Sequence, residues 1–390
     1  MDSHLIPPPL GLYIHLPWCV QKCPYCDFNS HALKGPLPER QYLNALLRDA
    51  DTEAEAASGR PIETVFIGGG TPSLFSAEAI QDLLDGLGQR LHMAADAEIT
   101  LEANPGTVEA QRFADYRAAG VNRISMGVQS LNDGHLRRLG RIHGGAEAVA
   151  AIHSARAAGF ERINVDLMHG LPAQSPAQAL EDVERILDLG IQHLSHYQLT
   201  LEPGTPFHNR PPTLPDEDAL ADIEAACAER IHEHGLHRYE VSAWAVPGEE
   251  CRHNLNYWAF GDYLAIGAGA HGKLTDRGGG IRRYSRLRFP RQYQAVAGTP
   301  QGLAECRRVE AGERVLEYLM NALRLTEGTA MDQALARTGL RREDFEPGLG
   351  IARARGWLSD DPAVLQATPL GQRYLNDLLG LFLDTDGAGS

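Results

Sequence analysis

Three cysteines within eight residues carry the strongest chemical signal in the sequence. Cys19, Cys23 and Cys26 have the spacing C-x3-C-x2-C, which supplies three thiolates from one short loop. A [4Fe–4S] cube held by three protein sulfurs keeps one iron without a protein ligand. Such an open iron is able to hold a small molecule, as the open position of a catalytic metal site does. A zinc site is the competing interpretation, with His15 or His31 as the fourth ligand.

The segment around these cysteines resembles a known family. Residues Tyr13 to Phe28, YIHLPWCVQKCPYCDF, resemble the radical S-adenosylmethionine (SAM) superfamily, in the branch of oxygen-independent coproporphyrinogen oxidases and their haem-chaperone relatives. The resemblance implies a [4Fe–4S] cluster on the three cysteines, with SAM chelated at the open iron through its amino and carboxylate groups. It also implies that an electron from the reduced cluster breaks a carbon–sulfur bond of SAM and releases a 5′-deoxyadenosyl radical.

Apolar, β-rich runs alternate with helical patterns along the first two-thirds of the chain, which predicts a parallel sheet with crossover helices. Several of these helical patterns end in a glycine, as helices commonly do. Six such βα units favour an α/β fold, an incomplete TIM-like (β/α)6 radical SAM barrel, which the resemblance also implies. The expected strands are 12–16, 64–68, 98–103, 123–129, 163–168 and 193–200, and the expected helices are 39–57, 77–91, 109–119, 146–158, 177–189 and 216–234.

Polar residues recur where the expected strands end. A glycine-rich turn at 68–72 follows the second strand, Glu102 and Gln129 close the third and fourth, and Asp166 lies near the end of the fifth. The C-terminal ends of barrel strands carry the active site. Any one of these features alone is often a tight corner or a helix cap. Together with the cysteine loop, which follows the first strand, they predict one convergent pocket.

The resemblance implies roles for individual residues at this rim. Tyr13, Gly69 and Glu102 match positions that contact the SAM on the cluster. Glycines let the backbone approach a ligand closely, and carboxylates accept charge-assisted hydrogen bonds. For Arg141, one of the further matches given next, the alternative is a solvated surface side chain. Further matches surround a second SAM-sized site in the decarboxylating oxidases: Gly70, Thr71, Gln129, Arg141 and Asp166.

Two departures separate the chain from the decarboxylating oxidases. Those enzymes have another cysteine two residues after the third cluster ligand, where this sequence has Phe28, and a longer segment ahead of the motif. Both differences match the haem-chaperone branch and disfavour decarboxylation of a porphyrinogen.

A second motif indicates the same branch. His253, Tyr257 and Trp258 form an H-N-x-x-Y-W segment that the chaperone branch shares. Imidazole is a good axial ligand for haem iron, and aromatic rings offer flat apolar surfaces to a macrocycle. Cys251 and His271 are the alternative ligands, and a purely structural role for the histidine and its aromatic neighbours is the competing interpretation.

The remainder of the chain predicts a second domain. A barrel domain is expected over 1–290 and a C-terminal helical, winged-helix-like domain over 291–390, with helices at 307–325, 330–336 and 344–355 and a strand at 363–366. The second domain contains more Asp and Glu than Arg and no Lys, so a lid or docking role is favoured over DNA binding. Arginines 282, 283, 286, 288 and 291 form a basic cluster, either solvated or a contact for haem propionates or an anionic membrane surface.

Composition and charge disfavour several other classes of protein. The chain has 390 residues and a net charge of −15, which disfavours broad contact with nucleic acid. No stretch approaches ~20 uninterrupted apolar residues, as a transmembrane helix requires, and the first ten residues do not resemble a secretory signal. Cys227, Cys251 and Cys306 are expected to be buried thiols in a reducing cytoplasm.

The sequence therefore predicts a cytoplasmic haem chaperone of the radical SAM type that binds a [4Fe–4S] cluster, SAM and haem and transfers haem to an acceptor protein. Whether the chain is also an enzyme stays open. The alternatives are an oxygen-independent coproporphyrinogen III dehydrogenase and another radical SAM enzyme that acts on haem or a related tetrapyrrole.

Overall fold

Six parallel strands form the centre of the molecule in a computed structural model that describes residues 5, 7–106, 112–276, 280–346 and 348–383. All six predicted strands are present, with ends shifted by a few residues, and the barrel-type α/β fold is confirmed. The central strands are β1 (Leu10–Leu16), β4 (Ile62–Gly69), β5 (Met93–Ala103), β6 (Arg123–Gln129), β7 (Arg162–His169) and β8 (His193–Gln198).

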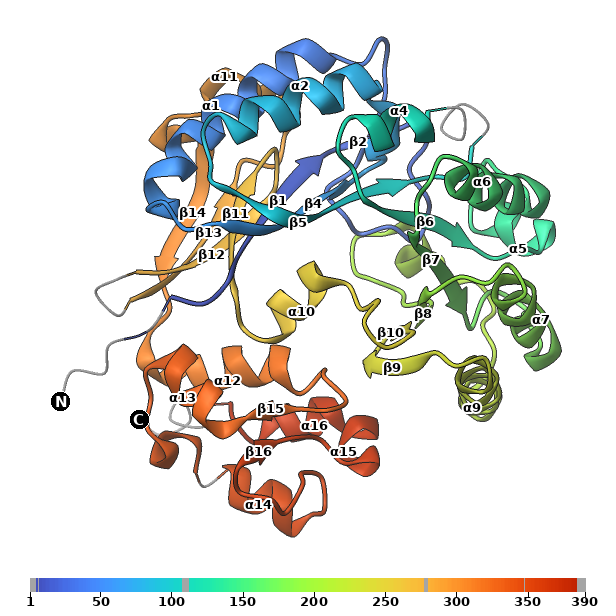
Figure 1. The fold of residues 1–390 in the computed structure, drawn as a ribbon. Coiled ribbons are helices and arrows are strands. Elements are labelled where there is room, and N and C mark those ends of the chain that lie inside the picture. The colour runs from blue at the N-terminus through green and yellow to red at the C-terminus, as the bar shows by residue number, and fades with distance from the viewer. Residues whose placement is uncertain (1–4, 6, 107–111, 277–279, 347, 384–390) are drawn as a thin grey trace.

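The sheet extends beyond these six strands at both edges and has twelve strands in the order β14-β13-β12-β11-β1-β4-β5-β6-β7-β8-β10-β9 (Figure 1). β11 pairs with β1 in parallel, and the strands beyond it are antiparallel. The additional strands are β9 (His237–Glu240), β10 (Ala243–Ala245), β11 (Asp262–Ile266), β12 (His271–Thr275), β13 (Ile281–Arg286) and β14 (Leu303–Arg308), and a separate two-stranded pair joins β2 (Trp18–Cys19) to β3 (His31–Ala32).

Helices follow the parallel strands along the chain, and Figure 1 shows them on the outside of the curved sheet. The predicted helix at 39–57 has the same bounds in the structure, and the start of the one predicted at 109–119 lies outside the described residues. The helices of this part are α1 (Glu39–Ala57), α2 (Ala77–Gly88), α4 (Phe113–Ala118), α5 (Asp133–Arg138), α6 (Gly145–Ala157), α7 (Pro176–Leu187), α8 (Pro206–Asn209), α9 (Glu217–Glu233), α10 (Arg252–Trp258) and α11 (Pro290–Val296), with 3-10 turns at Pro72–Leu74 and Pro300–Gly302.

The two faces of the parallel sheet differ in polarity because successive side chains of a strand point to opposite faces. Ile14 and Ile67 are fully buried in the main core, where they join side chains of α1 and α2 such as Leu46 and Ile80. The opposite face carries polar groups instead. Asn164 on β7, for example, hydrogen-bonds side chains of both neighbouring strands. A polar interior therefore runs along the barrel, and its C-terminal end is the predicted site.

Glycines after the helices turn the chain back into the sheet. Gly120, Gly159, Gly190 and Gly235 follow α4, α6, α7 and α9 with φ between 68° and 106°. A side chain at such a φ is strained, so glycine favours these corners. The predicted helix ends are confirmed at all four positions.

The C-terminal helices form a second, smaller core, grouped at one end of the sheet in Figure 1. The helix predicted from residue 307 begins instead at Ala311, because Arg307 belongs to β14 and Glu310 forms a capping box with Glu313. β14 pairs with β13, so the main sheet continues past the predicted boundary at residue 290. The elements are α12 (Ala311–Ala322), β15 (Thr329–Ala330), α13 (Met331–Thr338), a 3-10 turn at Arg342–Phe345, α14 (Gly348–Ala354), β16 (Val364–Leu365), α15 (Pro369–Arg373) and α16 (Leu375–Gly380).

Two predictions about surface and interior need correction. Cys227 and Cys251 are buried as expected, but Cys306 is exposed because it lies on β14 at the edge of the sheet. The basic cluster is not uniformly solvated either. Arg286 is buried and pairs with Glu53 and Asp49 of α1, so its charge is neutralised within the fold.

Candidate functional site

The cysteine loop begins where β1 ends, at the C-terminal end of the barrel. Cys19 is buried on the short strand β2, while Cys23 and Cys26 are half-exposed in the loop that leads to β3. Backbone hydrogen bonds hold the loop at both ends, from His31 N to Pro17 O at 2.7 Å and from Leu33 N to Cys19 O at 2.9 Å. The three thiols are therefore presented together on one anchored segment.

Thiols are the ligand type that an iron–sulfur cluster requires. Burial raises the pKa values of the Cys19 and Cys26 thiols, so binding a metal cluster must release their protons. The competing zinc interpretation requires a fourth ligand, and the structure excludes one of the two candidates for it. Both ring nitrogens of His15 are engaged, one by the Tyr13 hydroxyl at 2.9 Å and the other by the Asn29 carbonyl at 2.9 Å.

The predicted glycine-rich turn lies directly against the cysteine loop. Gly70 N donates to Leu16 O, and Thr71 N donates to Trp18 O. A Cβ atom on Gly70 would lie 2.5 Å from the carbonyl oxygen of Trp18, so only glycine fits there without displacing the backbone. The close approach of these two loops fixes the position of the cysteines relative to β4.

Two carboxyl groups of the predicted site lie near each other inside the rim. Burial, together with the nearby Asp166, raises the pKa of Glu102 to about 7, although Gly69 N donates to it at 3.0 Å. Burial also raises the pKa of Asp166, which accepts a hydrogen bond from Asn164 at 2.7 Å. The two carboxyl groups therefore favour the binding of a cation, because an added positive charge would stabilise the ionised form of both.

A chain of polar contacts links the cysteine loop to three strands. Arg141 Nη1 lies 3.8 Å from Cys23 Sγ, and its Nη2 donates to Asn104 at 2.8 Å and to the Gly127 carbonyl at 2.5 Å. Asn104 in turn donates to Thr71 Oγ1 at 3.0 Å. Arg141 is thus half-buried at the site and is not a solvated side chain. Sequence reasoning missed Asn104, although its place two residues after Glu102 was an available signal.

Gln129 lies at the same rim in an unusual backbone conformation. Its φ is 71°, in the left-handed region that non-glycine residues rarely adopt. Its Oε1 accepts a hydrogen bond from Tyr197 Oη on β8 at 2.9 Å. Such strain is characteristic of functional positions. Tyr197 was also missed, since its strand ends without a distinctive motif.

The H-N-x-x-Y-W segment lies at the other end of the barrel. It forms α10, which immediately precedes β11, and β11 runs parallel to β1. His253 is 1% exposed, Thr64 lies 2.8 Å from its Nδ1, and its ring stacks on Phe66. Burial lowers the pKa of His253 to about 3. The structure therefore does not bring the predicted haem residues together with the cysteines.

The aromatic residues of α10 join the barrel to the C-terminal helices. Tyr257 packs against Tyr263 of β11 with ring centroids 4.2 Å apart. The guanidinium of Arg324 lies 4.5 Å from the ring centroid of Trp258. Figure 1 shows α10, in yellow, between the sheet and the C-terminal helices. The role of this segment in haem binding stays a prediction.

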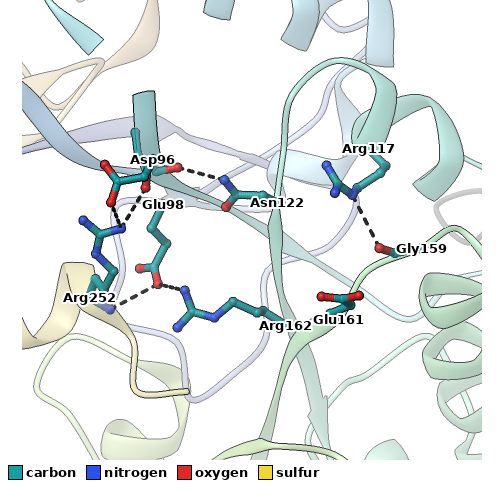
Figure 2. A pocket seen from close by; sticks show the side chains of 9 residues that line it. Asp96, Glu98, Arg117, Asn122, Gly159, Glu161, Arg162 and Arg252 are labelled. Carbon is teal, nitrogen blue, oxygen red and sulfur yellow. Dashed lines mark hydrogen bonds and ion pairs between the residues drawn. The ribbon is translucent and has the colours of Figure 1, made fainter. Parts of the chain in front are cut away.

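A polar cavity of about 250 Å³ lies near this second end, lined by residues of β5 and of the starts of β6 and β7. Figure 2 shows the side chains that line it. Its charges are largely paired within the protein. Arg162 Nη1 lies 2.7 Å from Glu98 Oε2, and the backbone N–H groups of Arg252 and His253 donate to the same carboxylate. Glu98, which sequence reasoning missed, therefore anchors the start of α10 to β5.

Comparisons with known proteins agree with the geometry of the rim. Residues 13–189 match the family described as the Radical SAM superfamily. "Heme chaperone HemW" of Escherichia coli (strain K12) is 53% identical over 378 residues, 96% of this chain and 98% of that protein. "Heme chaperone HemW" of Haemophilus influenzae is 48% identical over 380 residues, with 96% and 98% coverage. The chain belongs to the HemW family of radical SAM proteins.

The fold of this HemW family member also matches a solved structure. The coproporphyrinogen III oxidase HemN from Escherichia coli superimposes with a TM-score of 0.82 at 24% identity, covering 99% of this chain and 92% of HemN. The match supports the radical SAM fold. The radical SAM family implies a [4Fe–4S] cluster and SAM. The cysteine loop offers thiol ligands for the cluster, and the adjoining carboxylates offer hydrogen-bond acceptors for SAM. No helix among the described residues is long and apolar enough to cross a membrane.

Proposed function

We propose that the protein is a haem chaperone that carries a [4Fe–4S] cluster and SAM, binds haem and passes it to an acceptor protein. The observation that carries the proposal is the 53% identity to a protein named heme chaperone HemW over almost the whole of both chains. Phe28, at the position where the resemblance implies a cysteine in the decarboxylating oxidases, supports the same reading. The acceptor, a peripheral membrane contact and the cytoplasmic location belong to this proposal as well.

Cys19, Cys23 and Cys26 would hold the cluster, and Tyr13, Gly69 and Glu102 would contact the SAM bound to it. When bound, the cluster supplies an open iron for SAM and an electron for its cleavage. The protein contributes position and charge. Backbone groups of the glycine turn approach the ligand, and the Glu102 carboxylate neutralises part of its positive charge. We assign a second SAM-sized site to Gly70, Thr71, Gln129, Arg141 and Asp166.

The C-terminal helices are proposed as a second domain that covers the barrel end near α10 or docks the acceptor. Support comes from the contact of Arg324 with Trp258 and from the separate core of these helices. The resemblance of this second domain to a winged-helix module is part of the same proposal.

The decisive experiment compares haem with coproporphyrinogen on one preparation. Anaerobically reconstituted protein with SAM and reductant is expected to bind haem near one per chain and to leave coproporphyrinogen unchanged. A haem titration followed by visible spectroscopy and chromatography of the porphyrins measure the two results. Formation of a decarboxylated product would favour the dehydrogenase, and failure to bind haem would reject the chaperone.

Replacing Glu102 by glutamine is expected to weaken SAM binding roughly 10- to 100-fold without loss of iron, since a charge-assisted hydrogen bond contributes about 1.5–3 kcal/mol. The pKa of Glu102 is raised to about 7, so the carboxylate is present above that pH and protonated below it. SAM affinity of the wild type should therefore fall as pH drops through about 7, and that of Glu102→Gln should not.

Anaerobic calorimetry at several pH values measures both effects. Glu78→Gln, at an exposed position in the first turn of α2, is the matched control. Equal SAM affinity in Glu102→Gln with an intact cluster would show that this carboxylate serves only to hold Gly69.

A further inference from the structure

We propose that His193 is a positioning residue: acting through the side-chain amide of Asn164, it holds the Asp166 carboxylate in the orientation that receives the positively charged part of SAM. The inference rests on the proposed function, which places Asp166 in a SAM-sized site, and it adds two residues that support that site from inside the barrel. Both are buried, Asn164 on β7 and His193 at the start of β8.

Strand geometry brings these residues together in the polar interior of the barrel. Residues two apart on a strand point to the same face, so Asn164 and Asp166 lie on one face of β7. The strand register pairs Asn164 with Ser125 of β6 and with His193 of β8. Side chains of three adjacent strands therefore meet directly below Asp166, on the side away from the C-terminal ends of the strands.

The side-chain amide of Asn164 uses all of its hydrogen-bonding positions. Its Oδ1 accepts from His193 Nδ1 at 2.6 Å and from Ser195 Oγ at 3.1 Å. Its Nδ2 donates to Ser125 Oγ at 2.8 Å and to Asp166 Oδ1 at 2.7 Å. An amide has two acceptor sites and two donor hydrogens. Because both donors bind the oxygen, the amide nitrogen is held toward the carboxylate.

One tautomer of His193 fits this arrangement. Its Nδ1 faces Asn164 Oδ1, which only accepts hydrogen bonds, so Nδ1 carries the proton. Burial, together with the nearby Arg123, lowers the pKa of His193 well below its ordinary value, so the ring is neutral and Nε2 is an acceptor. Tyr239 Oη, 2.9 Å from Nε2, donates to it. The hydrogen bonds therefore run in one direction, from the Tyr239 hydroxyl to the Asp166 carboxylate.

This series of hydrogen bonds opposes the effect of burial on Asp166. Burial raises the pKa of Asp166, whereas the hydrogen bond from Asn164 favours the ionised form. An amide turned the other way would place its oxygen against the carboxylate and repel it. Other charged or titratable groups act on Asp166 from neighbouring elements, two of them cationic: Glu102 on β5, Arg123 on β6, Tyr197 on β8 and Arg141 after α5.

The alternative is a network in which buried polar groups only satisfy one another. Such a network needs no particular direction, whereas this one ends with an N–H group on a carboxylate of the proposed ligand site. Supporting hydrogen bonds of this kind hold binding groups in a productive orientation. The two explanations differ in one measurable respect, which is whether a donor at the position of His193 Nδ1 changes the affinity for the ligand.

The experiment measures the SAM affinity of full-length reconstituted protein by anaerobic calorimetry at several pH values. His193→Leu and His193→Asn form a matched pair, since both side chains branch at Cγ but only asparagine keeps an N–H donor near the position of Nδ1. His193→Leu is expected to weaken SAM binding roughly 3- to 10-fold, the effect of one hydrogen bond. It should also move the loss of affinity at low pH to a higher pH, because the ionised Asp166 carboxylate loses support. His193→Asn should resemble the wild type in both respects.

Two further variants separate positioning from packing. In an Asp166→Asn background, His193→Leu should cause no additional loss of SAM affinity, because its effect passes through the carboxylate. Tyr239→Phe removes the hydroxyl donor to His193 Nε2 and should weaken SAM binding by a smaller factor in the same direction. Urea unfolding and iron content are measured on every variant to exclude loss of the fold or of the cluster.

Equal losses in His193→Leu and His193→Asn, or an undiminished loss in the Asp166→Asn background, would show that His193 only fills the barrel interior and would overturn the inference. Unchanged SAM affinity in His193→Leu, or in Tyr239→Phe where His193→Leu does not fold, would overturn it as well. Failure of the wild type to bind SAM or haem would instead reject the proposed function, so the two failures are distinguishable.

Discussion

Replacing Cys23 by alanine is expected to abolish the broad absorbance near ~400 nm of anaerobically reconstituted protein, since a [4Fe–4S] cluster depends on its cysteine thiolates. The effect should be complete, because the loop offers three thiols and both ring nitrogens of the neighbouring His15 are already engaged. Cys19→Ala and Cys26→Ala should behave in the same way.

Cys306→Ala is the matched control, because this exposed thiol lies on the edge strand β14. It should retain full absorbance and iron content. Iron and sulfide analysis together with electron paramagnetic resonance of the reduced protein check the result. A cluster that survives in Cys23→Ala would contradict the assignment of the ligands, and stoichiometric zinc in the purified wild type without iron uptake would favour the zinc interpretation.

The repeating units of the barrel were predictable because each carries its own local signals. Strand β6 has its predicted bounds, and α1 has them as well, because β-branched runs, helical periodicity and terminal glycines all agree in these segments. The short strands β9, β10 and β12 were not predicted. Their pairing depends on neighbours distant in sequence, and a run of three to five residues contains too little pattern to indicate a strand.

The predicted rim residues converge for a topological reason. Glu102, Gln129 and Asp166 lie in the C-terminal halves of the neighbouring parallel strands β5, β6 and β7, whose carboxyl ends meet at one edge of the sheet. The contacts that connect them were beyond sequence reasoning, because they depend on the side-chain geometry of Asn104 and Tyr197.

The location of α10 shows a different limit of sequence reasoning. A motif indicates which residues are unusual, but its place in the fold depends on which strand follows it. α10 precedes β11, and β11 runs parallel to β1, so the helix reaches the barrel at the end where strands begin. His271 lies after β11 and therefore returns to the cluster end. Tyr257 packs on Tyr263 of β11, and Trp258 lies against Arg324, which follows α12, so the motif also has structural contacts.

Replacing Glu98 by alanine is expected to destabilise the protein by about 3–5 kcal/mol, because removal of one partner from a buried ion pair leaves uncompensated charge. The Glu98 carboxylate is fully buried, pairs with Arg162 and accepts the N–H groups of Arg252 and His253. Burial alone would raise its pKa, but Arg123 and Arg162 with these backbone donors hold the pKa below its ordinary value. Its stabilising contribution is therefore present above the ordinary glutamate pKa and is lost as pH falls through the lowered value.

Urea unfolding at pH 7 measures this loss, and limited proteolysis reports whether α10 detaches. Asp96→Ala is the matched control, since this carboxylate is 82% exposed and also pairs with Arg252, at 3.4 Å; an exposed pair contributes about 0–1 kcal/mol. The difference between wild type and Glu98→Ala should shrink below about pH 4, where the carboxylate of the unfolded chain becomes protonated. An equal, small loss in both variants would mean that α10 is held by its aromatic packing and not by the carboxylate on β5.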